Sequence, residues 1–402
     1  MEVLNQLFRR ARGGISSGCI MVGGKESMGP EELFLTLAEE ACMANRLLII
    51  LDAKQDKAGR IELINRIGPH ITRGAGYVFS PDVGSRETFD AFDFFSACST
   101  AIDKAGLLAD LLIMHSMNPS YRSEVVTYFQ YVLEMKRSSR LKDILSIDPR
   151  SAIAMLSPSD SGYESKRVFI DSFRTRVYGN VIAAINILVH SPEASLMGGS
   201  LKLDRLLHPG NVIVVSDDPP MTGDVNQNGL FQSVLLALMS SIKSYGITDA
   251  VILLRHADLI APYDLEALMD TAHSNHVLFV WMPEKIAKFI DAGGPVLEKV
   301  DYLSVFKTDK ITAESWANMF GHRDRKKVTT TNTSPKGILF SLGFGSIATG
   351  GLGVPQSSWR GSRSVTTSNE DKQNVTADQI STLRPGMAWN LYPDGSFSQG
   401  RI

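Results

Sequence analysis

Near the start of the chain, a strand, a glycine-rich turn and a helix follow one another in the order that proteins use to hold nucleotide phosphates. Residues 18–23 (Gly-Cys-Ile-Met-Val-Gly) predict a short buried strand, and residues 30–45, rich in Glu, Leu and Ala, predict a helix. Between them, Gly24 and Gly29 have the spacing of the pattern G-x-x-x-x-G-K-[ST]. In that pattern backbone N–H groups cradle the phosphates, the Lys contacts the β and γ phosphates, and the hydroxyl binds magnesium.

The two residues after this turn lack that chemistry, because Pro30 and Glu31 stand where the pattern requires Lys and Ser or Thr. Proline has no N–H to donate and no positive charge. A carboxylate at the helix N-terminus takes the end of the helix dipole where a phosphate would otherwise bind. Pro and Glu in the first turn instead favour a stable helix start. We interpret the turn as a degenerate nucleotide loop, with an ordinary strand-to-helix turn as the alternative. Its candidate residues are Gly24, Lys25, Ser27, Gly29, Pro30 and Glu31.

A second degenerate position follows the predicted strand 250–254 (Ala-Val-Ile-Leu-Leu). In P-loop hydrolases such a strand ends in acidic residues, which hold magnesium and activate the attacking water. Here the strand ends in Arg255 and His256, and Asp258 is displaced along the chain. A cation at this position repels magnesium, and Arg255 could instead bind a phosphate or pair with Glu31. A surface Arg beside a hydrogen-bonded His is the alternative interpretation.

Two further strands are predicted to end near the same edge of the sheet. The strand 277–281 runs into Met282 and Pro283, where an active motor would carry a polar residue that senses the γ-phosphate. The strand 47–51 runs into Asp52 and Lys54, which are the remaining candidates for a nucleotide site. The loop, the strand end at Arg255 and the strand end at Met282 thus keep their strand context without the chemical groups.

The elements that position these residues alternate between strand and helix. Short apolar runs suit parallel strands that are covered on both faces. The predicted strands are 18–23, 47–51, 76–80, 211–215, 250–254 and 277–281, and the predicted helices are 30–45, 57–67, 229–244, 262–274, 284–291 and 312–320. This order predicts an α/β fold with a mostly parallel central sheet and helices on both faces.

Two segments differ from this alternation. Residues 86–200 are mostly helical in pattern, which predicts a helical insertion. Residues 329–375 are rich in Thr, Ser, Gly and Asn, which predicts a flexible loop. The predicted division is 1–85 for the N-terminal part of the sheet domain, 86–200 for the insertion, 201–328 for the rest of the sheet domain, 329–375 for the loop, and 376–402 for a C-terminal segment with an edge strand near residues 389–392.

Composition places the chain among ordinary globular proteins. Of its 402 residues, 44% are hydrophobic and 21% charged, and the net charge of −2 gives no whole-chain signal for nucleic acid or membrane. Cys19, Cys42 and Cys98 are expected to be reduced, buried thiols, and neither they nor the eight histidines show metal-ligand spacing, so no metal is expected. There is no signal peptide and no apolar run of about 18 residues, so we expect a cytoplasmic protein that reaches a membrane only through partners.

The order of these motifs resembles the type IV coupling proteins, the hexameric RecA-like ATPases of bacterial conjugation and type IV secretion that are related to FtsK-type DNA pumps. The resemblance is diffuse and spans most of the chain. The segments that carry it are 52–56 (Asp-Ala-Lys-Gln-Asp), 77–81 with Ser85 and 89–92, 206–214, 375–380 and 383–388. The catalytic Lys, Ser/Thr and Asp-Glu of that family are missing at positions 30, 31, 255 and 256, and its N-terminal membrane anchor is not evident.

The resemblance implies a RecA-like P-loop NTPase fold and a place in a machine that translocates DNA or protein. The departures imply no ATPase activity, no cofactor, and a role as scaffold or motor partner. The expected partners are further copies in an oligomer or ring, an active ATPase, and other secretion or conjugation subunits, which would hold the chain peripherally at the inner membrane. Two alternatives stay open: an active ATPase that binds ATP and magnesium through Lys25, Lys54 and Asp258, and a DNA- or substrate-binding module without a nucleotide role.

Clusters of basic residues bear on the last alternative. Arg323, Arg325, Lys326 and Lys327 are candidates for nucleic-acid contacts, with solvated surface as the alternative. Two similar clusters are Arg9, Arg10 and Arg12, and Lys136, Arg137, Arg140 and Lys142. Arg174 and Arg176 are candidates for arginine fingers that reach into the site of a neighbouring subunit.

Overall fold

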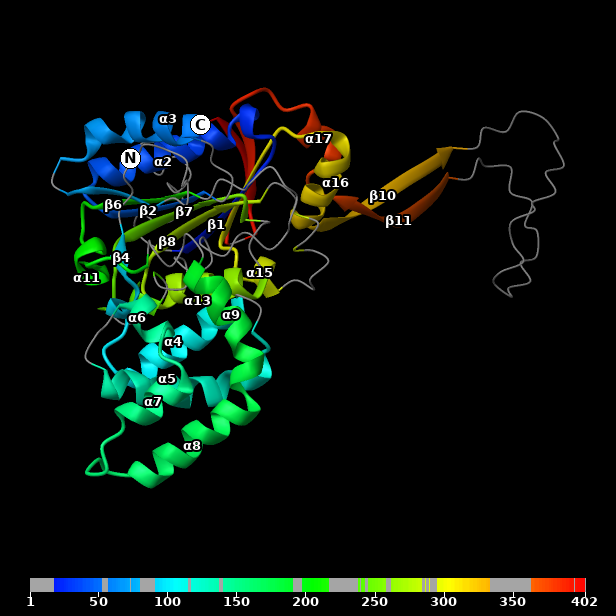
Figure 1. Ribbon diagram of the computed structural model, residues 1–402. Coiled ribbons are helices and arrows are strands. Elements are labelled where there is room, and N and C mark those ends of the chain that lie inside the picture. The colour runs from blue at the N-terminus through cyan, green and yellow to red at the C-terminus, as the bar shows by residue number, and fades with distance from the viewer. Residues whose placement is uncertain are drawn as a thin grey trace, which may run out of the picture.

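A nine-stranded sheet forms the centre of the molecule in the computed structural model (Figure 1). The described residues are 18–52, 57–72, 74–79, 91–114, 117–136, 140–190, 197–216, 238, 240–242, 245–257, 262–283, 286, 289, 295–332, 363–393 and 395–401. The strands of the sheet are β1 (Gly18–Gly23), β2 (Leu47–Asp52), β3 (Gly76–Phe79), β6 (Val212–Ser216), β7 (Ala250–Arg255), β8 (Leu278–Met282), β9 (Tyr302–Phe306), β12 (Met387–Leu391) and β13 (Phe397–Arg401). Their order is β13-β12-β9-β1-β8-β7-β2-β6-β3.

The sheet is mostly parallel, as the alternation of strands and helices predicts. β1 pairs in parallel with β8 and β9, and β2 pairs in parallel with β6 and β7. Among the described strands of this sheet only β12 runs in the opposite direction, and it pairs antiparallel with β9 and β13. The carboxyl ends of β1, β7, β8 and β9 therefore meet at one edge, where parallel α/β sheets bind their ligands.

Helices cover both faces of the sheet, and each face has its own hydrophobic core. α2 (Pro30–Met43) and α3 (Lys57–Ile67) lie on one face, and α13 (Pro262–Ser274) lies on the other (Figure 1). Alternate residues of one strand enter different cores: Ile20 and Val22 pack toward α2, whereas Cys19 and Met21 pack toward the opposite face. This period of two on fully buried strands explains why the strands are continuous apolar runs in the sequence.

The predicted helical insertion is present on the α13 side of the sheet (Figure 1). It contains α4 (Ala101–Met114), α5 (Arg122–Met135), α6 (Leu141–Leu145), α7 (Pro149–Met155), α8 (Tyr163–Arg176) and α9 (Tyr178–His190). Its centre is aromatic, because the rings of Tyr128 and Phe173 stack with centroids 4.4 Å apart. The insertion shares one continuous core with the adjacent face of the sheet. Two short strands, β4 (Phe92–Asp93) and β5 (Leu201–Lys202), pair where the chain enters and leaves it, and α11 (Leu203–Leu206) follows.

One edge of the sheet differs from the sequence prediction. β9 was not predicted, and the expected edge strand near residues 389–392 is instead an inner strand, β12, with β13 outside it. β9 carries Ser304 in its centre, and its hydroxyl donates a 2.5 Å hydrogen bond to Asn390 Oδ1 of β12. A polar residue in the middle of a short strand weakens the apolar signal, and only the partner strand explains why it is buried.

The expectation of a loop from residue 329 is wrong for the parts of that segment that the structure describes. β10 (His322–Asn332) and β11 (Arg363–Gln373) pair antiparallel as a two-stranded ribbon that projects from the body beside α16 (Lys310–Met319) and α17 (Ala377–Ser381) (Figure 1). The β-branched residues of this stretch favour strands once a partner is present. Residues 333–362 lie outside the described residues, as do most of the predicted helices 229–244 and 284–291.

No helix in the described part of the chain is both long and apolar enough to cross a membrane.

Candidate functional site

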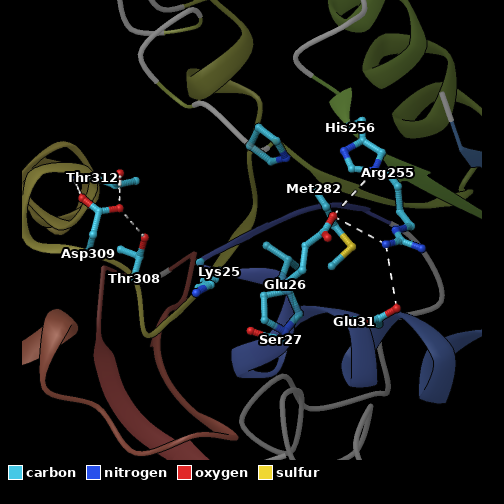
Figure 2. A pocket seen from close by; sticks show the side chains of 14 residues that line it. Lys25, Glu26, Ser27, Glu31, Arg255, His256, Met282, Thr308, Asp309 and Thr312 are labelled. Carbon is cyan, nitrogen blue, oxygen red and sulfur yellow. Dashed lines mark hydrogen bonds and ion pairs between the residues drawn. The ribbon is translucent and has the colours of Figure 1, made fainter. Parts of the chain in front are cut away.

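A pocket of about 760 Å³ lies at the carboxyl edge of the sheet, where the sequence predicted the degenerate nucleotide site (Figure 2). The glycine-rich turn forms its floor through Lys25, Glu26 and Ser27. The ends of β7 and β8 and the starts of α2 and α16 complete its walls. The structure therefore brings together the loop and the strand end that were singled out on sequence grounds.

Three backbone N–H groups of the loop between β1 and α2 donate to carbonyl groups of the protein itself. Residues Glu26–Met28 form a short 3₁₀ turn, η1, and the chain then enters α2 through Gly29. The Lys25 N–H donates to the carbonyl of Lys307 at 3.0 Å, the Met28 N–H to Lys25 at 2.8 Å, and the Gly29 N–H to Glu26 at 3.4 Å. Pro30 has no N–H at all. A phosphate would need such groups pointing into the loop, and these three N–H groups are already bound to carbonyl groups.

The glycines of the loop are explained by close packing against aromatic side chains. Gly24 and Gly29 have φ values of 124° and 138°, which side chains rarely adopt. A Cβ atom on Gly29 would lie 2.4 Å from the Phe306 ring, and one on Gly23 would lie 2.3 Å from the Trp316 ring. The spacing that resembles a phosphate-binding loop therefore has a structural cause that involves no ligand.

Arg255 connects three parts of the pocket through its guanidinium group. The parallel pairing of β2 and β7 places Arg255 directly opposite Asp52. Its Nη1 lies 3.2 Å from Asp52 Oδ2. Its Nη2 lies 3.5 Å from Glu26 Oε1 and 4.0 Å from Glu31 Oε1 (Figure 2). The predicted pairing with Glu31 is therefore present at the limit of an ion pair.

The surroundings of Arg255 are largely buried. Its side chain is 15% exposed and that of Asp52 is 1% exposed. The guanidinium carbon also lies 5.4 Å from the centre of the Phe34 ring, on the first turns of α2. An ion pair in such a setting is worth more than one in solvent, because its charges are screened less.

His256 adds a second basic side chain beside Arg255. Its backbone is left-handed, with a φ of 53°, which turns the chain as β7 ends. Its Nε2 lies 3.6 Å from Glu26 Oε1 and 3.7 Å from Asp52 Oδ1. Arg255 and His256 thus both face the carboxylates that the pocket contains.

The charges of this pocket differ from those of the P-loop pattern. In the P-loop pattern this strand end carries acidic residues that hold a metal ion, and here it carries Arg255, whose guanidinium lies 3.2 Å from Asp52. The phosphates would face Glu26 and Glu31 across the loop instead of a Lys side chain. Lys25 lines the pocket, but it follows the first glycine of the turn, whereas the Lys of the pattern follows the second.

The opposite wall of the pocket was missed by the sequence analysis. Thr308 and Asp309 lie between β9 and α16, and Thr312 lies in the first turn of α16 (Figure 2). The Asp309 carboxylate accepts from the Thr312 N–H at 2.9 Å and from its hydroxyl at 2.7 Å, so it caps α16. These hydrogen bonds hold the pKa of Asp309 below its usual value, and the bond from the Thr312 N–H has the largest effect. The spacing Thr-Asp-x-x-Thr is a helix-start signal that could have located this wall.

Other candidate residues lie away from the pocket or outside the described residues. Lys54 and Asp258 belong to the latter group. Arg323, Arg325, Lys326 and Lys327 belong to β10, on the projecting ribbon. Arg174 and Arg176 belong to α8 at the far end of the insertion, where Arg174 pairs with Asp171 at 2.7 Å (Figure 1).

Comparison with known proteins finds likeness in structure only, since no family model and no curated protein matches the sequence. The bacterial conjugative coupling protein TrwBdeltaN70 has a TM-score of 0.61 and 11% identity, over 99% of this chain and 91% of that chain. The plasmid coupling protein TrwB in complex with ADP and Mg²⁺ has a TM-score of 0.58 and 11% identity, over 96% and 85%. VirB4 of Thermoanaerobacter pseudethanolicus has a TM-score of 0.57 and 9% identity, over 96% and 89%. The chain therefore has the RecA-like P-loop NTPase fold of coupling proteins, as the resemblance implied.

Replacing Arg255 by Met should lower the free energy of unfolding by about 2–3 kcal/mol, because the buried Asp52 loses a cationic partner while the packing on Phe34 is largely kept. Urea denaturation measures this change. The matched control is Arg167→Met, whose side chain is 53% exposed and should change stability by no more than about 0.5 kcal/mol. Equal stability of the two variants would contradict a structural role for Arg255.

Proposed function

We propose that this chain is a catalytically degenerate, coupling-protein-like component of a conjugation or type IV secretion machine, acting as a scaffold or as the partner of an active motor. The RecA-like fold that it shares with TrwB and VirB4 supports the kind of machine. The pocket supports the loss of catalysis, because Arg255 contacts its carboxylates and three N–H groups of its loop donate within the protein.

The position of the Arg255 guanidinium carries this proposal. A magnesium ion beside Asp52 would have to displace a cation that contacts carboxylates of β2, η1 and α2. A triphosphate would also bring its negative charges against Glu26 and Glu31, and Pro30 stands where the pattern places its Lys. Pro30 also has no N–H to donate to a phosphate. The displacement of Arg255, the repulsion by the two carboxylates and this missing donor each disfavour the binding of magnesium and ATP.

Such a chain would exert its role through assembly. RecA-like subunits that lack their own catalytic groups still present the surfaces of the fold, which suits an oligomer, a ring or a complex with an active ATPase and other secretion subunits. Any contact with the inner membrane would then pass through those subunits.

A DNA-binding role is a second candidate, and the projecting ribbon favours it. Four of the five residues 323–327 are basic, and they lie on β10, which extends beyond the body of the protein (Figure 1). A basic strand that projects into solvent is suited to contact phosphate groups of a nucleic acid. This role would require no nucleotide at the pocket and is compatible with the scaffold role.

Isothermal titration of the protein with ATP and magnesium should show no binding, because Arg255 and the loop leave neither a metal position nor a phosphate cradle. TrwB, which is known in complex with ADP and Mg²⁺, serves as the positive control. Micromolar affinity that depends on magnesium would reject the proposal and favour the alternative of an active ATPase with displaced residues. In that case ATP turnover lost in Lys54→Ala or Asp258→Ala would identify the substitutes.

For the DNA-binding role, changing Arg323, Arg325, Lys326 and Lys327 to Glu should weaken binding to double-stranded DNA by at least about tenfold and flatten its salt dependence, since each phosphate contact adds about −0.9 to the slope. Fluorescence anisotropy across a salt series measures both effects. The matched control reverses four exposed bases of the insertion, Lys142, Arg150, Arg167 and Arg176. Similar losses in both variants would exclude the ribbon as the specific contact.

A further inference from the structure

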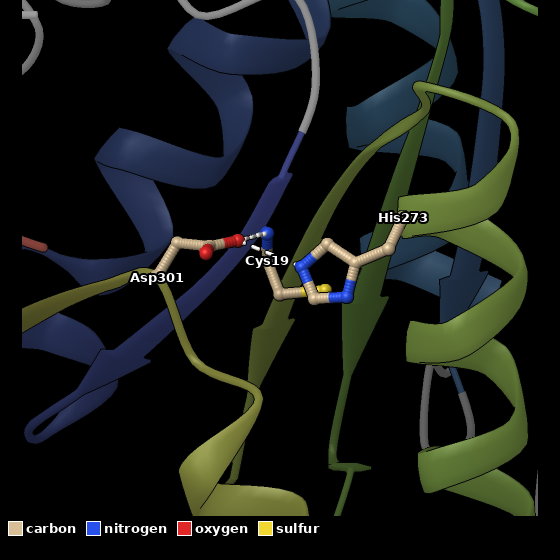
Figure 3. Close-up of side chains that lie close together, drawn as sticks. All are labelled: Cys19, His273 and Asp301. Atoms are coloured by element: carbon tan, nitrogen blue, oxygen red, sulfur yellow. Dashed lines mark hydrogen bonds and ion pairs between the residues drawn. The ribbon is translucent and has the colours of Figure 1, made fainter.

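Three side chains that could bind a metal converge at the opposite end of the sheet from the pocket (Figure 3). Cys19 lies at the start of β1, His273 in the last turn of α13, and Asp301 immediately before β9. One ligand atom from each, a sulfur, a ring nitrogen and a carboxylate oxygen, lie within 4.8 Å of one another. The residues are 254 and 28 positions apart along the chain (19 to 273, and 273 to 301), which is why no sequence pattern indicated the cluster.

The backbone already fixes two of the three residues. The Asp301 N–H donates to the Cys19 carbonyl at 2.8 Å, and the Cys19 N–H donates to Asp301 Oδ2 at 2.7 Å. His273 Nε2 lies 2.8 Å from the same carboxylate oxygen. The Cys19 thiol makes only a long, weak contact of 4.0 Å with the Met269 carbonyl. These hydrogen bonds therefore position the three side chains, while the Cys19 sulfur makes no strong hydrogen bond among the described residues.

The cluster does not resemble a nucleophilic site. Cys19 is 0% exposed, so no substrate reaches its sulfur. Burial, and then the charges of Asp301 and Asp270, raise the pKa of this thiol. His273 is directed to the carboxylate of Asp301. A thiol used in catalysis would instead be accessible and would have a lowered pKa.

Negative charge surrounds the cluster on its solvent side. Asp301 and Asp270 both act on Cys19, and Lys299 is the neighbouring cation. Lys299 is, however, bound to Asp270 at 2.6 Å and to Glu266 at 2.9 Å. The Asp301 carboxylate is thus left with a histidine and a backbone N–H, and a divalent cation would supply the charge that it lacks.

We propose that Cys19, His273 and Asp301 are the protein ligands of a zinc site, with water from the open side as the fourth ligand. Sulfur, imidazole and carboxylate are the donor set that Zn²⁺ prefers in proteins. Tetrahedral zinc with bonds of about 2.0–2.3 Å separates its donors by about 3.3–3.6 Å, so shifts of about 1 Å from the present positions suffice. The side chains of His273 and Asp301 are 37% and 38% exposed, which gives both room to move and a path for the ion.

The site would join β1, α13 and β9 at the amino ends of the strands. It is independent of the proposed function, because the pocket at the other edge shares none of its ligands. Binding of the ion to the folded state alone would stabilise the protein in proportion to the logarithm of metal concentration.

Cobalt(II), a spectroscopic substitute for zinc, tests the proposal in the full-length reduced protein. We expect visible d–d bands of tetrahedral cobalt, a thiolate-to-cobalt charge-transfer band in the near ultraviolet, loss of both on addition of Zn²⁺, and a rise in Tm with either metal. Cys19→Ser should abolish the charge-transfer band. Asp301→Asn keeps an acceptor for the Cys19 N–H but should weaken cobalt binding by about tenfold or more.

Cys42→Ser is the matched control, because Cys42 is also buried but lies on α2, and it should leave both bands unchanged. If Cys19→Ser does not fold, Asp301→Asn decides the question through its cobalt affinity. The proposal is overturned if the wild-type protein gives no charge-transfer band at saturating cobalt, if Cys19→Ser retains that band, or if Asp301→Asn binds cobalt as tightly as the wild type. In those cases the three residues form only a hydrogen-bonded link between β1, α13 and β9.

Discussion

The ion pair between Arg255 and Asp52 determines how the carboxyl edge of this sheet is organised. Parallel pairing of β2 and β7 sets the two residues opposite each other, and both are removed from most of the solvent. Two opposite charges at 3.2 Å in such a place stabilise each other, and either one alone would be costly to bury. The Arg255 guanidinium also contacts Glu26 in the loop and Glu31 in the first turn of α2. The loop conformation and the charge pair therefore support the same arrangement.

The stability of the sheet depends on its hydrophobic cores and not on the residues at its carboxyl edge. The two hydrophobic cores consist of strand residues that face α2 and α3 on one side and α13 with the insertion on the other. Each fully buried Leu, Ile or Val contributes about 1.5–3 kcal/mol through the hydrophobic effect, so the sheet needs no nucleotide to hold it together. Phe306 and Trp316 fill the space against Gly29 and Gly23. The contacts that hold this RecA-like scaffold together are therefore internal to the protein.

Much of this scaffold follows from local patterns in the sequence. Continuous apolar runs located β1, β2, β7 and β8 because strands buried on both faces have no polar alternation. Pro30 with Glu31 located the start of α2, and the observed α3 matches the predicted helix 57–67. The sequence therefore predicts that the residues at the ends of β1 and β7 lie close together.

The parts that were missed depend on contacts between distant segments. β9 is short and carries Ser304, whose burial is explained only by Asn390 of β12. The ribbon of β10 and β11 pairs residues on either side of a long intervening segment, and its Thr-rich composition also suits a loop. Thr308 and Asp309 carry a capping pattern that is common at helix starts and does not identify a pocket by itself. Cys19, His273 and Asp301 meet only because α13 and the residue before β9 pack against the start of β1.

A crystal structure of the protein grown with millimolar ATP and magnesium tests the central claim most directly. The account predicts that the guanidinium of Arg255 stays against Asp52, that the 3₁₀ turn Glu26–Met28 keeps its internal hydrogen bonds, and that no nucleotide occupies the pocket. Density for a triphosphate against Gly29 and the start of α2, with a metal ion beside Asp52 and Arg255 displaced, would contradict it.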